Sequence, residues 1–267
     1  MHFKRLFLSM SILAVAIGIS TASAASAYPD TLPGGKINVG SADYFSVLSN
    51  GDTTITGPSF VIGNVGAGGN FSMSDGHVDG NVVLRSGHSA KTSGPARING
   101  SVFTNDSQLN QAWLDAQNLS MSASMEAVTP AYASLTNVNI TNPSQNITIT
   151  GGPNQKVVLS LQNFVITNGT FTLQGTATTS FIINVAKNFS LSNGGISLAG
   201  VPPQNVLFNI LGSGSDVSLK QGTRLPGILL ALNRKVDLSG GHVTGKVIAN
   251  QVVITSGGSV VSPSTNP

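Results

Sequence analysis

The sequence contains no cysteine and few charged residues, and both shortages limit what the protein can be. Without disulfide bonds, a chain of 267 residues must be stabilised by its own core and its backbone hydrogen bonds. Charged residues make up only 9%. Two of the thirteen Lys and Arg are Lys4 and Arg5, so the rest of the chain has eleven basic and ten acidic residues and is nearly neutral. Because it lacks a basic stripe with interleaved aromatic residues, we expect no nucleic-acid partner.

Residues suited to catalysis or metal binding are also scarce. After His2 the only histidines are His77, His88 and His242. The serines of residues 212–216 lie near an acid but lack the strand-turn-helix setting of a reactive serine. Residues 75–81 lack the ligand spacing and closing glutamate of a calcium loop. We therefore predict a non-enzymatic protein with no catalytic residue, no cofactor and no metal.

The first residues have the pattern of a secretory signal peptide. Lys4 and Arg5 precede an apolar run over residues 6–19, which is too short to span a bilayer comfortably. Small residues then offer cleavage sites after Ala24 or Ala27. We expect a secreted, extracellular protein with no membrane span in the mature chain. The last residues show neither a hydrophobic tail nor a sorting pentapeptide, so we expect no surface anchor.

Internal similarity is the strongest signal after the leader. Residues 71–84 align without a gap with residues 236–249, and six of fourteen positions match, where chance gives about one. The matching pairs are Ser74/Ser239, Gly76/Gly241, His77/His242, Val78/Val243, Gly80/Gly245 and Val82/Val247. Because His77 and His242 occupy equivalent places in the repeat, we interpret them as structural positions.

Looser copies of the same phrase begin at Phe164, Phe189 and Val217, ahead of the copy at Val236. The intervals between these four positions are 25, 28 and 19 residues. Apolar residues alternate at period two within each copy, and an Asn-Gly or Ser-Gly pair turns the chain in most of them. Such intervals suit one solenoid coil each. The sequence predicts a mainly β fold, an irregular right-handed β-solenoid (β-helix) with one long α-helix packed alongside; a hairpin-based sandwich is the main alternative.

One segment breaks the β pattern, because residues from about 107 to 128 lack glycine and place apolar residues at helical spacing. Asp106 or Ser107 is expected to cap this helix, and Pro130 to prevent its continuation. Trp113, the only tryptophan, is expected to seal the helix against a solenoid face, with ligand stacking as the alternative. The predicted organisation is a signal peptide over 1–24, a lead-in over 25–39, one solenoid domain over 40–261, and a tail over 262–267. Within the lead-in, Pro29–Val39 is expected to cover an open solenoid end.

Five phrases carry a resemblance to a known family. They are DYFSVL at 43–48, GNVGAGGNF at 63–71, VLFNI at 206–210, PGILLA at 226–231 and LSGGHVTGKVIAN at 238–250. Together they resemble the choice-of-anchor A domain, an extracellular bacterial family, over about residues 40–258. The resemblance implies a secreted or surface-displayed adhesive module, and some members are described as collagen-binding. We therefore expect an extracellular macromolecule or cell-envelope component as the partner, and no residue here matches a collagen site.

The order of elements is also similar to that of bacterial ice-binding proteins. Residues 54–58 precede the helix, and residues 169–173 and 227–232 follow it. This likeness makes ice binding the alternative function. Its candidate residues are the T-x-T pairs Thr54 and Thr56, Thr148 and Thr150, and Thr170 and Thr172. A third hypothesis, non-catalytic carbohydrate binding, is limited by the single Trp and three Tyr, and the oligomeric state is not defined by the sequence.

Overall fold

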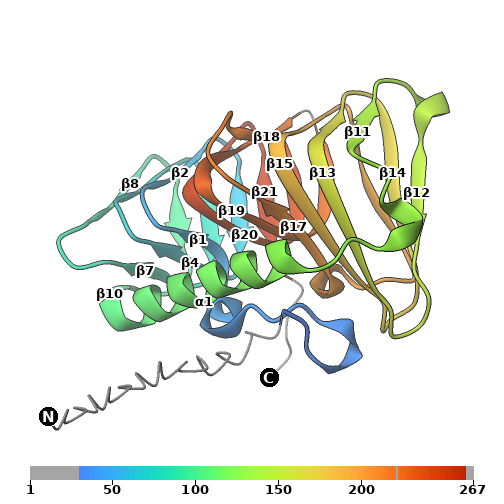
Figure 1. Cartoon of the computed structure of the whole chain (residues 1–267). Helices are drawn as coiled ribbons and strands as arrows, with labels where there is room; N and C mark the ends of the chain where they lie inside the picture. Colours follow the sequence, from blue (N-terminus) through green and yellow to red (C-terminus); the bar gives the residue numbers. More distant parts are fainter. Residues whose placement is uncertain (1–29, 221, 263–267) are drawn as a thin grey trace, which may run out of the picture.

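The computed structural model describes residues 30–220 and 222–262, which form a three-faced β-solenoid with one long helix, α1 (Asp106–Met125), along one face (Figure 1). Strands of successive coils pair in parallel. This excludes a hairpin-based sandwich and confirms the predicted fold class. The predicted signal peptide and its cleavage positions, Ala24 and Ala27, lie outside the described residues.

Each face is a ladder of nine parallel segments, and the four longest strands bend around corners to serve more than one face. The helix face consists, in spatial order, of the first parts of β13 (Lys156–Ile166) and β15 (Ser180–Ser192), β17 (Val206–Ile210), the middle parts of β19 (Arg224–Ser239) and β20 (His242–Thr255), β1 (Phe45–Ser49), β4 (Asn64–Ala67), β7 (Val82–Leu84) and β10 (Val102–Thr104).

The other two faces follow the same spatial order of coils. The second face consists of β11 (Asn137–Ile140), the last parts of β13 and β15, β18 (Val217–Lys220), the last parts of β19 and β20, β2 (Thr53–Thr56), β5 (Phe71–Ser74) and β8 (Ala90–Ser93). The third face consists of β12 (Ile147–Thr150), β14 (Gly169–Gln174), β16 (Gly194–Ala199), the first parts of β19 and β20, β21 (Ser259–Val261), β3 (Phe60–Ile62), β6 (His77–Asp79) and β9 (Arg97–Ile98). Short 3-10 helices are η1 (Pro33–Gly35), η2 (Gly40–Tyr44), η3 (Pro130–Tyr132), η4 (Pro143–Gln145) and η5 (Pro203–Asn205).

The coils do not stack in the order of the sequence. The first coil, β1 to β3, lies in the middle of the solenoid and pairs with β20 and β21 of the last coil, as the blue and red strands of Figure 1 show. The following coils run outward to β8, β9 and β10, and α1 then returns along the helix face to the other end, where β11 begins. The first and last coils therefore close each other's backbone edges at this joint.

The repeat spacing predicted from the sequence is confirmed. Phe164 pairs with Phe189, and Val217 pairs with Val236, so each interval between copies of the phrase is one coil. On the third face, His242 pairs with Ser259, Ser259 pairs with Phe60, and Phe60 pairs with His77. His242 and His77 thus occupy the same place in coils that lie three steps apart.

Apolar side chains fill two separate layers. The solenoid interior is packed around phenylalanines, of which Phe164 and Phe189 stack with ring centroids 5.0 Å apart. The second layer lies between α1 and the helix face, where small residues such as Ala112 and Ala116 let the helix approach closely. Trp113 is half-buried against this layer, which confirms its predicted sealing position.

The ends of the helix differ from the prediction. Its cap is Asn105, whose side-chain oxygen accepts a hydrogen bond from the Gln108 amide at 3.1 Å, whereas Asp106 accepts one from the Ser86 amide. The helix ends at Met125, three residues before the expected end, and Glu126 continues in extended conformation. The carboxylate of Glu126 lies 2.6 Å from Lys156 of β13, so an ion pair accompanies this earlier end.

The lead-in was predicted to cover an open solenoid end, and this is wrong for the described residues. Residues 30–39 instead lie beside α1 over the middle of the helix face. The Ile37 amide donates to the Gln204 carbonyl at 2.9 Å, and the Asn205 side chain donates to the Gly34 carbonyl at 3.0 Å. The hydrophobic effect explains this position of the lead-in. Ile37 is fully buried in the apolar layer on the helix face, which α1 alone does not cover.

Candidate functional site

The second face presents mainly short, uncharged polar side chains. Strand residues alternate in direction, so most apolar ones point into the core and most Ser, Thr and Asn between them point outward. Val253, which pairs with Thr54, is an outward apolar residue, and Thr53 is buried. No register shift interrupts the ladder from β20 through β2 and β5 to β8. The register of this part of the face is therefore regular.

Seven outward residues on five neighbouring strands form what we name the hydroxyl array. Its members are Thr54, Thr56, Ser72, Ser74, Ser93, Ser239 and Thr255. Neighbouring strands place equivalent side chains about 4.8 Å apart, and residues two apart along a strand are separated by about 6.7 Å. Ile55 and Ile254, directly beneath, are fully buried, so the array stands on a close-packed support.

Charged side chains border this array rather than interrupting its centre. Lys220 and Asp237 lie on the strands before Thr255, and Lys91 lies on the last strand, β8. Beyond them, an asparagine ladder crosses the far end of the same face. Asn163 donates to Asn137, and Asn188 donates to Asn163, each at 2.8 Å.

The structure divides the six sequence-predicted threonines between two faces. Thr54 and Thr56 lie on β2, within the hydroxyl array. The other four, Thr148 and Thr150 on β12 and Thr170 and Thr172 on β14, lie at one end of the third face. There Thr148 pairs with Thr172, while Thr150 pairs with Gln174 and Thr170 with Gly195. The six cannot form one surface.

The third face is uneven beyond these threonines. Its outward column includes Arg224, His242, Phe60, His77 and Arg97, which differ widely in size and charge. Phe60 and His77 stack with ring centroids 5.2 Å apart. A regular hydroxyl lattice therefore does not extend along this face.

Five members of the hydroxyl array were not predicted from the sequence: Ser72, Ser74, Ser93, Ser239 and Thr255. A signal for two of them was present, because Ser74 matches Ser239 in the gapless repeat alignment. The alignment indicates that this serine holds a structural place in the repeat. The T-x-T pattern does not identify an array that mixes Thr with Ser.

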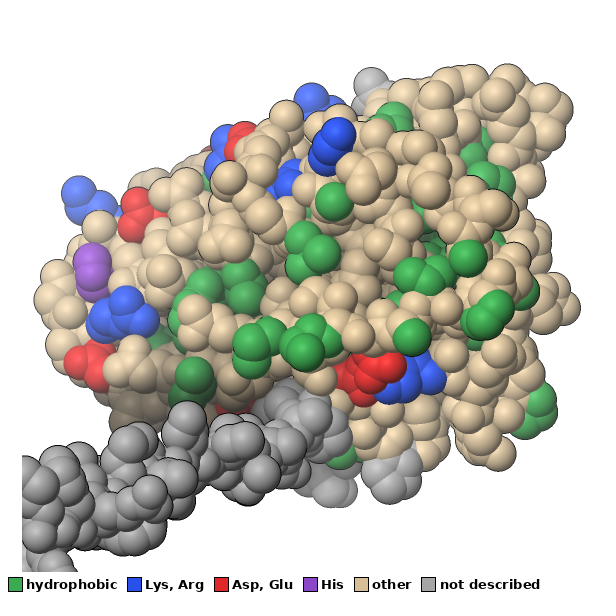
Figure 2. All heavy atoms as spheres, in the orientation of Figure 1, with side chains coloured by type: hydrophobic (Ala, Val, Ile, Leu, Met, Phe, Trp, Pro, Cys, Tyr) green, Lys and Arg blue, Asp and Glu red, His purple; other side chains and the backbone are tan. Residues whose placement is uncertain are grey.

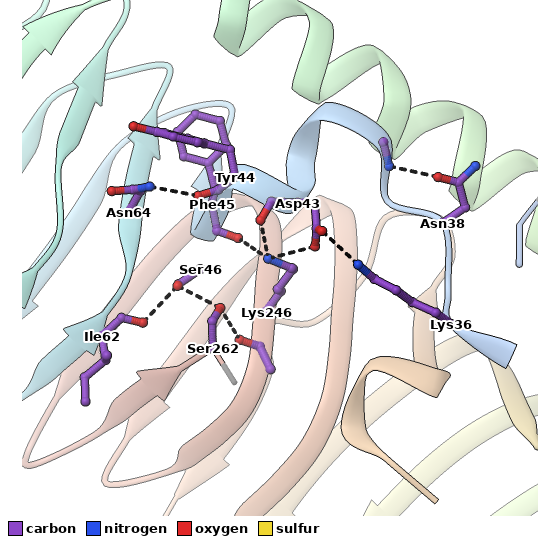
Figure 3. Close-up of polar contacts among 12 residues, drawn as sticks. Lys36, Asn38, Asp43, Tyr44, Phe45, Ser46, Ile62, Asn64, Lys246 and Ser262 are labelled. Carbon is purple, nitrogen blue, oxygen red and sulfur yellow. Dashed lines mark hydrogen bonds and ion pairs between the residues drawn. The ribbon is translucent and has the colours of Figure 1, made fainter. Parts of the chain in front are cut away.

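A cavity of about 520 Å³ lies between η2, β3 and β20 (Figure 3). Lys246 enters it from β20 and donates to the Asp43 and Phe45 carbonyls at 2.6 and 3.0 Å. Burial lowers the pKa of Lys246, although the nearby Asp43 carboxylate opposes this. Asp43 also pairs with Lys36 at 2.9 Å. These contacts fasten η2 to β20 and, through Lys36, connect the lead-in to η2.

The ion pairs of Asp43 lead to a pH-dependent prediction. Burial alone would raise the pKa of Asp43, but hydrogen bonds and charges from Lys36 and Lys246 outweigh it, and the pKa lies below 3.8. A carboxyl with a lowered folded-state pKa stabilises the fold above its unfolded pKa, and this contribution is lost as the pH falls through the folded one. Because Asp43 is 36% exposed, Asp43→Asn should lower the free energy of unfolding by less than about 1 kcal/mol at pH 7.

Urea denaturation of both proteins between pH 7 and pH 2.5 measures this difference. It should shrink toward zero at the acid end. A difference that stays constant with pH would show that the Asp43 charge contributes nothing.

Within residues 30–220 and 222–262, no three His, Asp or Glu side chains come together as metal ligands would. No helix among the described residues is both long enough and apolar enough to cross a membrane.

Comparisons with known proteins agree with this geometry. A family model described as "Putative Ice-binding-like adhesive domain" matches residues 31–261. The fold is similar to that of a glycosylated ice-binding protein from an Arctic yeast, with 18% identity, a TM-score of 0.61, and coverage of 87% of this chain and 96% of that one. It is also similar to the DUF3494 domain of Shewanella frigidimarina ice-binding protein 1, with 18% identity, a TM-score of 0.55, and coverage of 88% and 100%.

An ice-binding protein from the Antarctic ascomycete Antarctomyces psychrotrophicus has 17% identity and a TM-score of 0.54, with coverage of 85% of this chain and 98% of that one. Identities this low show a shared fold and do not transfer function. Among curated proteins, none matches the chain.

Proposed function

The chain belongs to the ice-binding-like adhesive domain family, and we propose that it binds ice through the hydroxyl array of its second face. The observation that carries the proposal is a row of Thr and Ser on five neighbouring strands: Ser239, Thr255, Thr56, Ser74 and Ser93. Thr54 and Ser72 form a second, shorter row between Val253 and Lys91. Ice presents no group that could fill a pocket, so a protein must bind it through many weak contacts at fixed spacing. A rigid, regular array supplies these contacts with only a small entropic cost for ordering its side chains on binding.

Two further properties of the array support this function. The side chains are short, so few rotamers are lost on contact, and threonine also brings a methyl group that adds apolar contact. Ser72 donates to Thr54 at 3.2 Å, which fixes the position of neighbouring hydroxyls. The adjoining faces are less suitable, since α1 covers one and Arg224 and Arg97 project from the other.

The proposal includes the wider role predicted from the sequence. The chain is proposed to be a secreted, non-enzymatic adhesive module of a bacterial extracellular protein, for which ice is the surface bound. The choice-of-anchor A resemblance fits an extracellular adhesive role and stays a prediction. Adhesion to another extracellular macromolecule or cell-envelope component is the second candidate, because the family description itself includes an adhesive domain.

Thermal hysteresis and ice-crystal shape of the purified chain test the proposal directly. We expect a measurable gap between melting and freezing, faceted crystals, and partition of the protein into a slowly growing ice hemisphere. Absence of all three effects at about 1 mM protein would refute ice binding and leave adhesion to another extracellular surface as the function.

A pair of matched variants identifies the face. Thr56→Tyr places a bulky ring in the centre of the array, so we expect it to remove most of the hysteresis. Thr172→Tyr makes the same change at an equally half-buried threonine on the third face and should leave activity unchanged. Both variants should melt within a few degrees of the parent. Loss of activity only in Thr172→Tyr would overturn the assignment to the second face.

A further inference from the structure

A groove of about 760 Å³ runs between α1 and the solenoid corner that joins the helix face to the second face. One wall is a single stripe of the helix, which includes Trp113, Gln117 and Met121 at helical spacing. The opposite wall comes from corners of neighbouring coils, and Asn50, which follows β1, lies next to Asn250 of β20. The hydroxyl array lies on another surface, so this groove is separate from the proposed ice-binding site.

The lining of this groove is entirely uncharged. Hydrophobic side chains alternate with amides and hydroxyls, and Figure 2 shows hydrophobic and uncharged side chains along the helix, with charged ones near its ends. Because there is no lysine, arginine or acid in the lining, the groove offers no counter-charge to an ionic ligand.

Three asparagine side chains in the groove have no hydrogen-bond partner among the described residues. Within the described residues, the side-chain amides of Asn50, Asn233 and Asn250 make no hydrogen bond to other protein groups. They lie near the half-buried indole of Trp113, which occupies the same groove. An amide both donates and accepts, so it suits a vicinal pair of sugar hydroxyls, and the ring of Trp113 suits the apolar face of a pyranose.

We propose that this groove binds a segment of a neutral oligosaccharide, with Trp113 as the stacking platform and the three asparagines as hydrogen-bonding partners. A charged polymer is disfavoured because its charges would lie among uncharged groups. A purely apolar ligand is disfavoured because it would remove the amides from water without replacing their hydrogen bonds. The groove is open and shallow, so a single site of weak affinity is expected.

The experiment uses the fact that Trp113 is the only tryptophan in the chain, so its fluorescence reports on the groove alone. The probes are chitohexaose, cellohexaose, maltohexaose and laminarihexaose, with hexagalacturonate as the charged comparison. We expect at least one neutral hexasaccharide to shift and protect the tryptophan emission saturably, with an apparent Kd of about 0.1–1 mM. Hexagalacturonate should have no effect.

The double variant Asn233→Ala and Asn250→Ala keeps the fluorophore and should weaken this binding at least about tenfold. Asn139→Ala removes an exposed amide from β11, far from the groove, and should titrate as the parent does. The proposal is overturned if no neutral hexasaccharide changes the tryptophan emission at concentrations up to 10 mM, or if hexagalacturonate binds as tightly as the neutral hexasaccharides. It is also overturned if the double variant binds as tightly as the parent. None of these results bears on thermal hysteresis, so the two functions are tested separately.

Discussion

Replacing Arg234 with methionine is expected to lower the free energy of unfolding by about 3–5 kcal/mol. Arg234 is 2% exposed and lies at the corner between the middle and last parts of β19. Its guanidinium donates to backbone carbonyls of the two preceding coils, including that of Leu211 at 2.7 Å. The other acceptors are the carbonyls of Ala186, Lys187, Gly212 and Ser215. Methionine would fill part of the space but leave all five carbonyls without this donor.

Urea denaturation followed by tryptophan emission and circular dichroism measures the loss. Arg234→Lys should recover only part of it, because an ammonium on a flexible chain cannot reach the same set of carbonyls as a planar guanidinium. Arg224→Met, at an exposed position on the third face, is the control and should change stability by less than about 0.5 kcal/mol. A loss below about 1 kcal/mol for Arg234→Met would show that water replaces the guanidinium at these corners.

The repeat phrase and the helix could be predicted because their signals are local. Period-two alternation with a turn pair identifies a strand and its corner, and the interval from Phe164 to Phe189 gives the length of a coil. The helix was identified from spacing and from the absence of glycine. Its exact ends depended on partners from distant strands, such as Lys156, which no local pattern contains.

The order of coils and the composition of each face could not be obtained in the same way. Coil lengths of 25, 28 and 19 residues vary, so counting from one phrase does not tell which face a given threonine joins. Thr56 and Thr172 have the same local pattern yet lie on different faces. The joint between β1 and β20 brings together residues about 200 positions apart, as in the pair Val47 and Val247. Part of the hydroxyl array depends on that joint.

Gly245→Ala is expected to prevent correct folding or to cost more than about 4 kcal/mol. Gly245 has a φ of +148° at the corner between the third face and the helix face. A Cβ there would lie 1.9 Å from the carbonyl oxygen of Gly227, its neighbour in the preceding coil, which is itself at φ +139°. Neither backbone can move away, because the strand pairs directly before and after the two glycines hold them in place. These pairs are Pro226 with Thr244 and Ile228 with Lys246.

Circular dichroism melting and soluble yield check this expectation against Gly257→Ala, a glycine at φ +82° with open space around its Cβ position. The control should lose only about 1 kcal/mol, from backbone strain alone. A Gly245→Ala protein that melts within a few degrees of this control would show that the corner relaxes. The effect should also extend beyond the corner, since Lys246 follows directly and its ammonium fastens η2 through the carbonyls of Asp43 and Phe45. Close contact between the glycine corners of successive coils is therefore required both for the stacking of coils and for the attachment of η2 to the solenoid.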